Sequence, residues 1–243
     1  MPAIRVPRVV YLLTGLCLVL GSAWIDQPDL GRSVAVQPAA FDVTDADPAV
    51  VARVAPAAVF GDSTSIPCAA GTTDLGVHDG YHGGIKVPVR LCAVNNLIST
   101  RGEGVPSSPY YIKGANGHAV VNSRVSGAVQ TMVRDMKAAG LAVRSFSSYR
   151  SMQHQRDLCA ADVNCKAHNY HYLAAPGTSN HQMGLAIDFT MPMAKTPGAS
   201  CAAPAGSPNN TVWKWLKVHA AHYGLEQYMA EPWHWEAAGA NSC

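Results

Sequence analysis

The amino-acid sequence predicts an α+β domain in which a small antiparallel sheet is flanked by helices. The clearest helix covers residues 123–139, where apolar side chains recur at helical spacing and form one face that a sheet must cover. The stretch LAIDF, residues 185–189, alternates its side chains between two faces as a strand does. With 243 residues, 48% of them hydrophobic and 14% charged, the chain is long enough for one well-buried core.

Residues 1–25 have the composition of a signal peptide or an N-terminal anchor. Arg5 and Arg8 precede the uncharged stretch 9–25, and the small residues 21–23 offer a cleavage site. If the leader is not cleaved, residues 9–25 would tether the protein to a membrane. Both alternatives predict an exported protein, located outside the cell, in the cell wall or on the periplasmic side of the membrane.

Residues 26–65 are rich in Ala, Val, Pro and Asp and lack a sustained period, which predicts a tether. The folded domain is therefore expected to cover residues 66–243. Its first strand is expected at residues 85–94, in which Pro88 favours an edge position. The two asparagines at 95–96 favour a turn after that strand.

Helices and strands alternate along the rest of the chain. Residues 141–150 are expected to form a strand that ends in a polar turn, and residues 151–161 a second helix. After the LAIDF strand, another helix is expected over residues 211–223, where Gly224 ends it. The last segment, residues 225–236, is expected to be one strand that ends at the functional site.

Six cysteines follow the leader, and an even number in an exported protein predicts three disulfides. Sequence proximity favours two pairs and leaves a third: Cys68–Cys92, Cys159–Cys165 and Cys201–Cys243. The sequence contains no CxxC pair, which argues against a zinc ion bound by cysteines.

The formal net charge of +2 depends on the leader. Cleavage after Ala23 would remove two arginines and no acid, which leaves 16 basic and 16 acidic residues. The sequence shows no cluster of lysine and arginine, so a nucleic-acid binder is excluded as an interpretation. Nothing in the sequence implies a protein partner.

The stretch GTSNHQMGLAIDFT, residues 177–190, places His181 and Asp188 beside an apolar strand. A buried carboxylate is costly unless it is paired or coordinates a metal. Together His181, Asp188 and His234 supply two imidazoles and one carboxylate, a set suited to a catalytic zinc that keeps one position open for water. We therefore predict one zinc ion per chain, bound where residues 177–190 meet the segment that carries His234.

Three blocks of the sequence resemble the LAS-type zinc peptidases and, among them, the VanY-like D-alanyl-D-alanine carboxypeptidases. They are SSYRS at residues 147–151 with Gln155 after it, SNHQMGLAID at residues 179–188, and EPWHWE at residues 231–236. The resemblance covers about residues 80–240 and implies the LAS or hedgehog-like peptidase fold, with the zinc site at the sheet.

The resemblance also implies roles for single residues. The three ligands named above bind zinc, Glu231 is the general base, and Arg150 binds or stabilises the substrate. A carboxylate near the metal can take the proton of the attacking water and pass it to the leaving amine. A guanidinium suits either a substrate carboxylate or an oxyanion. Strand alternation would put Glu231 and His234 on opposite faces, so we expect a bend between them.

Ser179 and Gln155 are further candidates for substrate binding. Ser179 lies two residues before a ligand and either contacts the peptide or holds the loop, and the structural role is favoured. Other side chains have simpler interpretations, since the two tryptophans beside His234 are expected to pack in the core. Five histidines are expected at the surface: His154, His168, His171, His219 and His222.

The resulting hypothesis is an exported, zinc-dependent D-alanyl-D-alanine carboxypeptidase that acts on peptidoglycan stem peptides. An endopeptidase on the same polymer, for example at an L-alanyl-D-glutamate bond, would use the same residues. The alternative from another class is a zinc-stabilised binding module without turnover. Glu231 argues against that module, because a structural metal site has no need of a base beside it.

Overall fold

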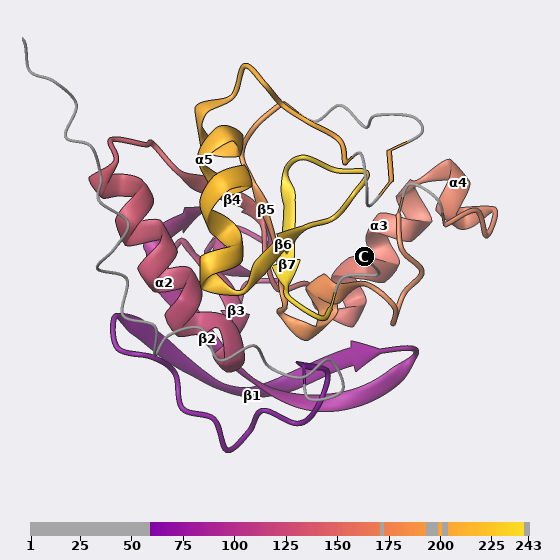
Figure 1. The fold of residues 1–243 in the computed structure, drawn as a ribbon. Coiled ribbons are helices and arrows are strands. Elements are labelled where there is room, and N and C mark those ends of the chain that lie inside the picture. Colours follow the sequence, from indigo (N-terminus) through magenta and orange to yellow (C-terminus); the bar gives the residue numbers. More distant parts are fainter. Residues whose placement is uncertain (1–58, 171–172, 193–198, 201–203, 241–243) are drawn as a thin grey trace, which may run out of the picture. The chain divides into compact units, whose positions relative to one another are not determined.

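A computed structural model describes residues 59–170, 173–192, 199–200 and 204–240 (Figure 1). The expected leader, most of the expected tether, His171, Cys201 and Cys243 lie outside these residues. Among the described helices, none combines the length and the apolar character that a membrane span requires.

One mixed sheet of seven strands organises the fold, in the order β1-β2-β4-β5-β7-β6, with β3 also paired to β2. The strands are β1 (Thr72–His82), β2 (Ile85–Ser99), β3 (His118–Asn122), β4 (Arg144–Ser147), β5 (Ala186–Phe189), β6 (Leu225–Gln227) and β7 (His234–Ala237). The pairs are antiparallel except for β2 and β4. The α+β class is confirmed. The sheet is not purely antiparallel, because β3 and a helix form a crossover between β2 and β4.

The helices are α2 (Ser123–Ala138), α3 (Met152–Ala161), α4 (Val163–Lys166) and α5 (Thr211–His219). Short 3-10 turns are η3 (Gly102–Gly104), η4 (Asn180–Met183) and η5 (Ala220–Tyr223). The predicted helix 123–139 is confirmed as α2, whose buried apolar face packs against β2. In Figure 1, α3 and α4 lie on the opposite side of the ribbon from α2. The helix predicted over 211–223 is α5 continued by η5, and Gly224 ends it at a φ of 69°.

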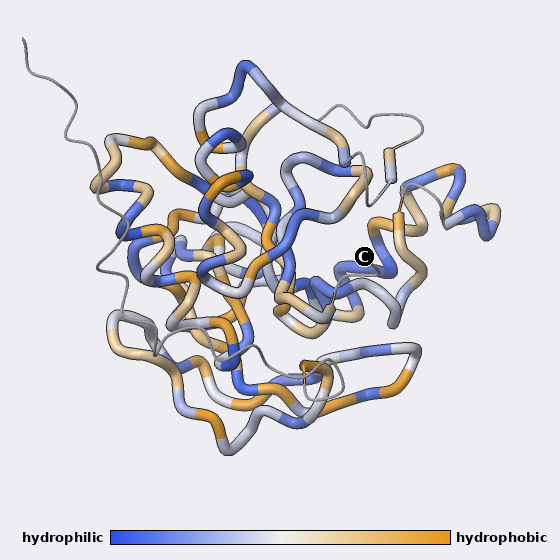
Figure 2. The backbone as a smooth tube through the Cα atoms, viewed as in Figure 1, coloured by the Kyte–Doolittle hydropathy of each residue, from blue (hydrophilic) through white to orange (hydrophobic). Residues whose placement is uncertain are grey.

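The first strand of the sheet was not expected from the sequence, because β1 lacks a regular alternation. It forms a hairpin with β2 (Figure 2), and only the first part of β2, IKVPVRL, alternates hydrophobic with other residues. Pro88 lies in the part of β2 that pairs with β1 alone, as an edge position requires. The turn predicted at residues 95–96 is wrong. There β2 continues to Ser99, with an irregularity in its pairing to β3 between Val94 and Ile98.

The last residues of the expected tether belong to the folded domain. Val59 is buried, and the buried Ser63 accepts a hydrogen bond from the backbone N–H of Arg90 on β2 through its Oγ atom at 3.0 Å. The edge of the domain expected at residue 66 therefore lies earlier in the chain. Two disulfides predicted by proximity, Cys68–Cys92 and Cys159–Cys165, are confirmed.

The last segment forms two strands rather than the single strand predicted. β6 and β7 pair as an antiparallel hairpin, and residues 228–233 form the connection between them. The backbone N–H of Tyr228 donates to the carbonyl of His234 at 3.0 Å, which closes this connection. Trp233 and Trp235 are both buried, so their predicted packing role is confirmed. The connection places residues 228–233 outside the pleat of the sheet.

Candidate metal centre

Two adjacent strands and one 3-10 turn bring three ligand-type side chains together. Asp188 on β5 lies directly opposite His234, the first residue of β7, in the antiparallel pairing. His181 lies on η4, which precedes β5. The chain turns from η4 toward β5 at Gly184, where a φ of 69° and the backbone nitrogen of Asn122 leave no room for a side chain. This short connection explains the spacing of seven residues between His181 and Asp188.

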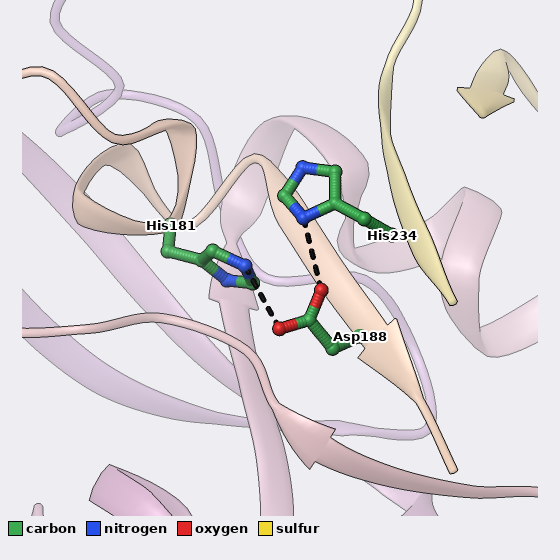
Figure 3. A group of neighbouring side chains, drawn as sticks. All are labelled: His181, Asp188 and His234. Atoms are coloured by element: carbon green, nitrogen blue, oxygen red, sulfur yellow. Dashed lines mark hydrogen bonds and ion pairs between the residues drawn. The ribbon is translucent and has the colours of Figure 1, made fainter. Parts of the chain in front are cut away.

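The three side chains point toward one another (Figure 3). Asp188 Oδ2 lies 3.2 Å from His181 Nε2, and Asp188 Oδ1 lies 2.9 Å from His234 Nδ1. One ligand atom from each residue falls within 4.8 Å of the others. His181 and Asp188 are buried, and the side chain of His234 is 12% exposed. Two imidazole nitrogens and one carboxylate oxygen in this arrangement fit a divalent metal ion.

In each histidine, the ring nitrogen that faces away from Asp188 also has a partner. His181 Nδ1 lies 2.7 Å from the carbonyl oxygen of Ser148, a partner that can only accept, so Nδ1 carries the proton and Nε2 faces the cluster. His234 Nε2 lies 3.2 Å from Glu236 Oε2, and the same oxygen accepts a hydrogen bond from Asn180 Nδ2 at 2.6 Å. Outer partners of this kind orient metal-binding imidazoles and raise their basicity.

The charges of the cluster are strongly coupled. Burial lowers the pKa of His181, which favours a neutral imidazole. Burial by itself would raise the pKa of Asp188, but His181 and His234 outweigh it and hold that pKa well below its usual range. Burial by itself would lower the pKa of His234, but the hydrogen bonds to Asp188 and Glu236 raise it to about 10. The raised pKa keeps a second proton on the His234 imidazole. Because metals bind neutral imidazole, metal binding would displace that proton.

Glu236 was missed by the sequence analysis, although strand alternation could have found it. His234 and Glu236 are two residues apart on β7 and therefore share a face. We expect a Glu236→Gln variant to bind metal about 10- to 100-fold more weakly, the range for losing an outer partner of a metal-binding histidine. Competition against a chelator of known affinity measures this change. An affinity equal to that of the wild type would show that Glu236 does not support His234.

Glu231 lies in the connection before β7. Its backbone N–H donates to the carbonyl of Tyr228, and its carbonyl accepts from the N–H of His234, both at 3.2 Å. This turn is the bend that the sequence required between Glu231 and His234. Glu231 Oε2 lies 4.0 Å from His234 Nδ1, and the side chain is 16% exposed. The carboxylate is therefore beside the ligand cluster without being part of it.

Arg150 follows β4 and is almost buried. Its Nη1 donates to Gln155 Oε1 at 2.8 Å, and its Nη2 donates to Ser147 Oγ at 2.9 Å. The same Nη2 lies 3.9 Å from Asp188 Oδ2. Gln155 has no exposed surface, and its amide nitrogen donates to the carbonyl of Ala174 at 2.6 Å. Gln155 thus holds the guanidinium of Arg150 from a buried position.

The ligand cluster opens into a cleft of about 680 Å³. Arg150, Ser179 and Glu231 line it together with the three ligand residues. Aromatic side chains from separate parts of the chain add to the wall: Phe60, Phe146, Tyr170, Tyr228 and Trp233. A concave site with a few convergent polar groups is typical of small-molecule and peptide binding.

Four of the five histidines expected at the surface lie among the described residues. His168 and His222 are exposed, as expected, whereas His219 is half-buried. The side chain of His154 is only 16% exposed and lies 3.1 Å from the buried carboxylate of Glu103, so its expected surface position is wrong. This contact depends on a loop far away in the sequence, which no local pattern could indicate.

Comparison with known proteins gives one family. Residues 118–240, about half of the chain, match the family model described as VanY, D-alanyl-D-alanine carboxypeptidase. A D-alanyl-D-alanine carboxypeptidase of Enterococcus faecalis (strain ATCC 700802 / V583) is 26% identical over 147 residues, which are 51% of this chain and 50% of the relative. The chain spans about half the length of the curated relatives it matches.

The comparison with solved structures gives similar names. A vancomycin-resistance D,D-pentapeptidase VanY mutant in complex with Zn(II) is 26% identical, covers 51% of this chain and 76% of that chain, and gives a TM-score of 0.39. The LD-carboxypeptidase LdcB is 24% identical, covers 50% of this chain and 60% of that chain, and gives a TM-score of 0.39.

Proposed function

Because the chain belongs to the VanY family of D-alanyl-D-alanine carboxypeptidases, we propose that it removes the terminal D-alanine from peptidoglycan stem peptides. The observation that carries this proposal is the joint position of the His181–Asp188–His234 cluster, Glu231 and Arg150 in one cleft. Cleavage beside a free carboxyl end requires three parts: a metal-binding set, a base, and a cation that binds the substrate carboxylate.

His181, Asp188 and His234 would hold a zinc ion. When bound, zinc lowers the pKa of a coordinated water to about 7 and polarises the scissile carbonyl. The donor set supports zinc, since imidazole nitrogen with one carboxylate is the pattern of catalytic zinc sites. The outer contacts of both histidines keep the donor atoms aimed at one point.

The other residues would handle the proton and the substrate. Glu231 is the general base, because its carboxylate lies beside the cluster and lines the cleft. It takes a proton from the attacking water and passes it to the amine of the departing D-alanine. Arg150 binds the terminal carboxylate of the peptide, with Gln155 and Ser147 fixing the guanidinium. Ser179 lines the cleft and contacts the peptide or holds the loop before His181.

This reaction would take place where stem peptides occur, outside the cytoplasmic membrane. Two disulfides support an exported protein, because disulfides persist in oxidising compartments. The leader would direct export, either as a cleaved signal peptide or as a membrane tether through residues 9–25.

Mass spectrometry of reaction products tests the proposal. The zinc-loaded protein is incubated with a stem pentapeptide that ends in D-alanyl-D-alanine, and separately with the matching tetrapeptide and with the pentapeptide amidated at its carboxyl end. We expect the free pentapeptide to lose one alanine, the other two peptides to stay intact, and a chelator to stop the reaction.

Other products would contradict this assignment in identifiable ways. Fragments from inside the stem would identify an endopeptidase, and alanine loss from the tetrapeptide would identify an L,D-carboxypeptidase. Equal cleavage of the free and the amidated pentapeptide would exclude the carboxylate role of Arg150. Intact peptides in every sample, with zinc bound, would favour the non-catalytic binding module.

A further inference from the structure

A second buried carboxylate lies close to Arg150, on a segment that precedes the family-matched residues 118–240. Glu103 belongs to η3, and its side chain is only 1% exposed. A buried carboxylate is costly unless several donors satisfy it. The contacts of the Glu103 carboxylate therefore show which residues it holds in place.

The partners described for the Glu103 carboxylate lie at the beginning of α3. Glu103 Oε1 accepts a hydrogen bond from the backbone N–H of Ser151 at 2.6 Å. Both carboxylate oxygens lie 3.1 Å from His154 Nδ1. Ser151 is the N-cap of α3, whose first N–H groups favour a negative charge. Glu103 thus fixes the residue that directly follows Arg150.

The backbone of Arg150 is consequently held on both sides. Its own N–H donates to the carbonyl of His181 at 3.0 Å, which links it to the metal cluster. The next N–H, that of Ser151, donates to Glu103. Because Gln155 lies one turn further along the same helix, the position of α3 also decides where Arg150 finds its side-chain partner.

The loop that carries Glu103 is itself fixed. The Glu103 carbonyl accepts from the N–H of Ile112 at 2.9 Å, and a side chain at Gly104 would collide with the backbone oxygen of His118. Tyr110 stacks on His154 with ring centroids 4.0 Å apart. Its hydroxyl donates to Asp157 on α3 at 2.8 Å. The loop and the first turns of α3 therefore form one packed unit.

We propose that Glu103, paired with His154, is a positioning residue that sets the orientation of Arg150 toward the substrate carboxylate. The proposal rests on the role of Arg150 given above. Glu103 acts through the peptide bond between Arg150 and Ser151 and does not touch the substrate. The isosteric variant Glu103→Gln keeps an acceptor for Ser151 but removes the charge that holds His154.

The first test needs no activity. Within the described part of the chain, Arg150 Nε is buried and has no hydrogen-bond partner, so exchange of its proton with water reports how often this region opens. The exchange is followed by NMR, in which the signal that disappears in an Arg150→Lys variant is assigned to this proton. We expect exchange to be at least about tenfold faster in Glu103→Gln. An unchanged rate would overturn the proposal, whether or not the protein turns over a peptide.

The second test uses kinetics with the free pentapeptide. We expect Glu103→Gln to raise KM about tenfold and to change kcat less than about twofold, because the carboxylate contact is made equally before and during reaction. In an Arg150→Lys background the same change should have almost no further effect, since residues that act through one another are not additive. An equal loss in both backgrounds would mean a purely structural role and would overturn the proposal.

The matched control is Asp162→Asn. Asp162 accepts hydrogen bonds from the backbone N–H groups of Asn164 and Cys165 at 2.9 and 2.8 Å, so its carboxylate, like that of Glu103, holds backbone N–H at the start of a helix. This variant should leave KM and the Arg150 exchange rate unchanged.

If Glu103→Gln does not fold, His154→Phe is the second variant. It keeps a ring stacked on Tyr110, removes the contact to Glu103 and is expected to give the same two results. A wild type that releases no alanine would refute the proposed function, while the exchange rate would still decide on Glu103.

Discussion

A Glu231→Gln variant is expected to bind metal like the wild type and to lose between about 100-fold and 10,000-fold of kcat, the range for a general base. Glu231 is 4.0 Å from His234 Nδ1 and lies in the turn before β7, outside the ligand cluster. The exchange of one carboxylate oxygen for an amide group removes the proton acceptor with little change in volume. Metal affinity and activity should therefore respond independently.

The measurement pairs release of alanine from the pentapeptide with metal content of the same samples. Glu226→Gln is the matched control, because Glu226 is exposed on β6 of the same hairpin and should behave like the wild type. Full activity in Glu231→Gln would remove Glu231 from the mechanism and direct attention to Glu236, the other carboxylate near His234. Loss of metal from Glu231→Gln would instead make Glu231 part of the metal site.

The candidate site could be predicted from the sequence because its residues lie on short, regular connections. A spacing of seven residues from His181 to Asp188 suits one 3-10 turn followed by a strand. The pairing of Asp188 with His234 then needs only that β5 and β7 are neighbours. The bend before His234 followed from alternation, since two residues that act at one point cannot lie on opposite faces of a strand.

Contacts between distant segments could not be predicted in the same way. Glu103 and His154 are 51 residues apart, and each is of a residue type that is seldom fully buried. The same reason explains the error at residues 95–96, where two asparagines favour a turn. The residues of β2 on either side of them pair with β1 and β3, which keeps the strand extended. The helix α2 was predicted well because its apolar face is a local pattern over four turns.

Asp188 is the residue on which the whole centre depends. It lies within 3.2 Å of both histidines and 3.9 Å from Arg150, and its side chain is 6% exposed. Its negative charge balances the positive charges around it and supplies the oxygen ligand of the cluster. No other carboxylate of the described residues belongs to the same ligand group. Glu231 and Glu236 lie near His234 but are not members of this ligand group.

We therefore expect an Asp188→Asn variant to bind zinc more than about 100-fold more weakly, beyond the loss expected for an outer partner such as Glu236. Alanine release from the pentapeptide should fall in parallel and recover in part when zinc is added in excess. Competition with a chelator measures the affinity, and Asp135→Asn on α2 serves as a control for the chemical change. Asp135 bonds to Tyr223 and Arg134 away from the cleft, so its variant should keep the wild-type affinity. Unchanged zinc binding in Asp188→Asn would mean that the metal is held elsewhere, and the assignment of His181 and His234 as ligands would fail with it.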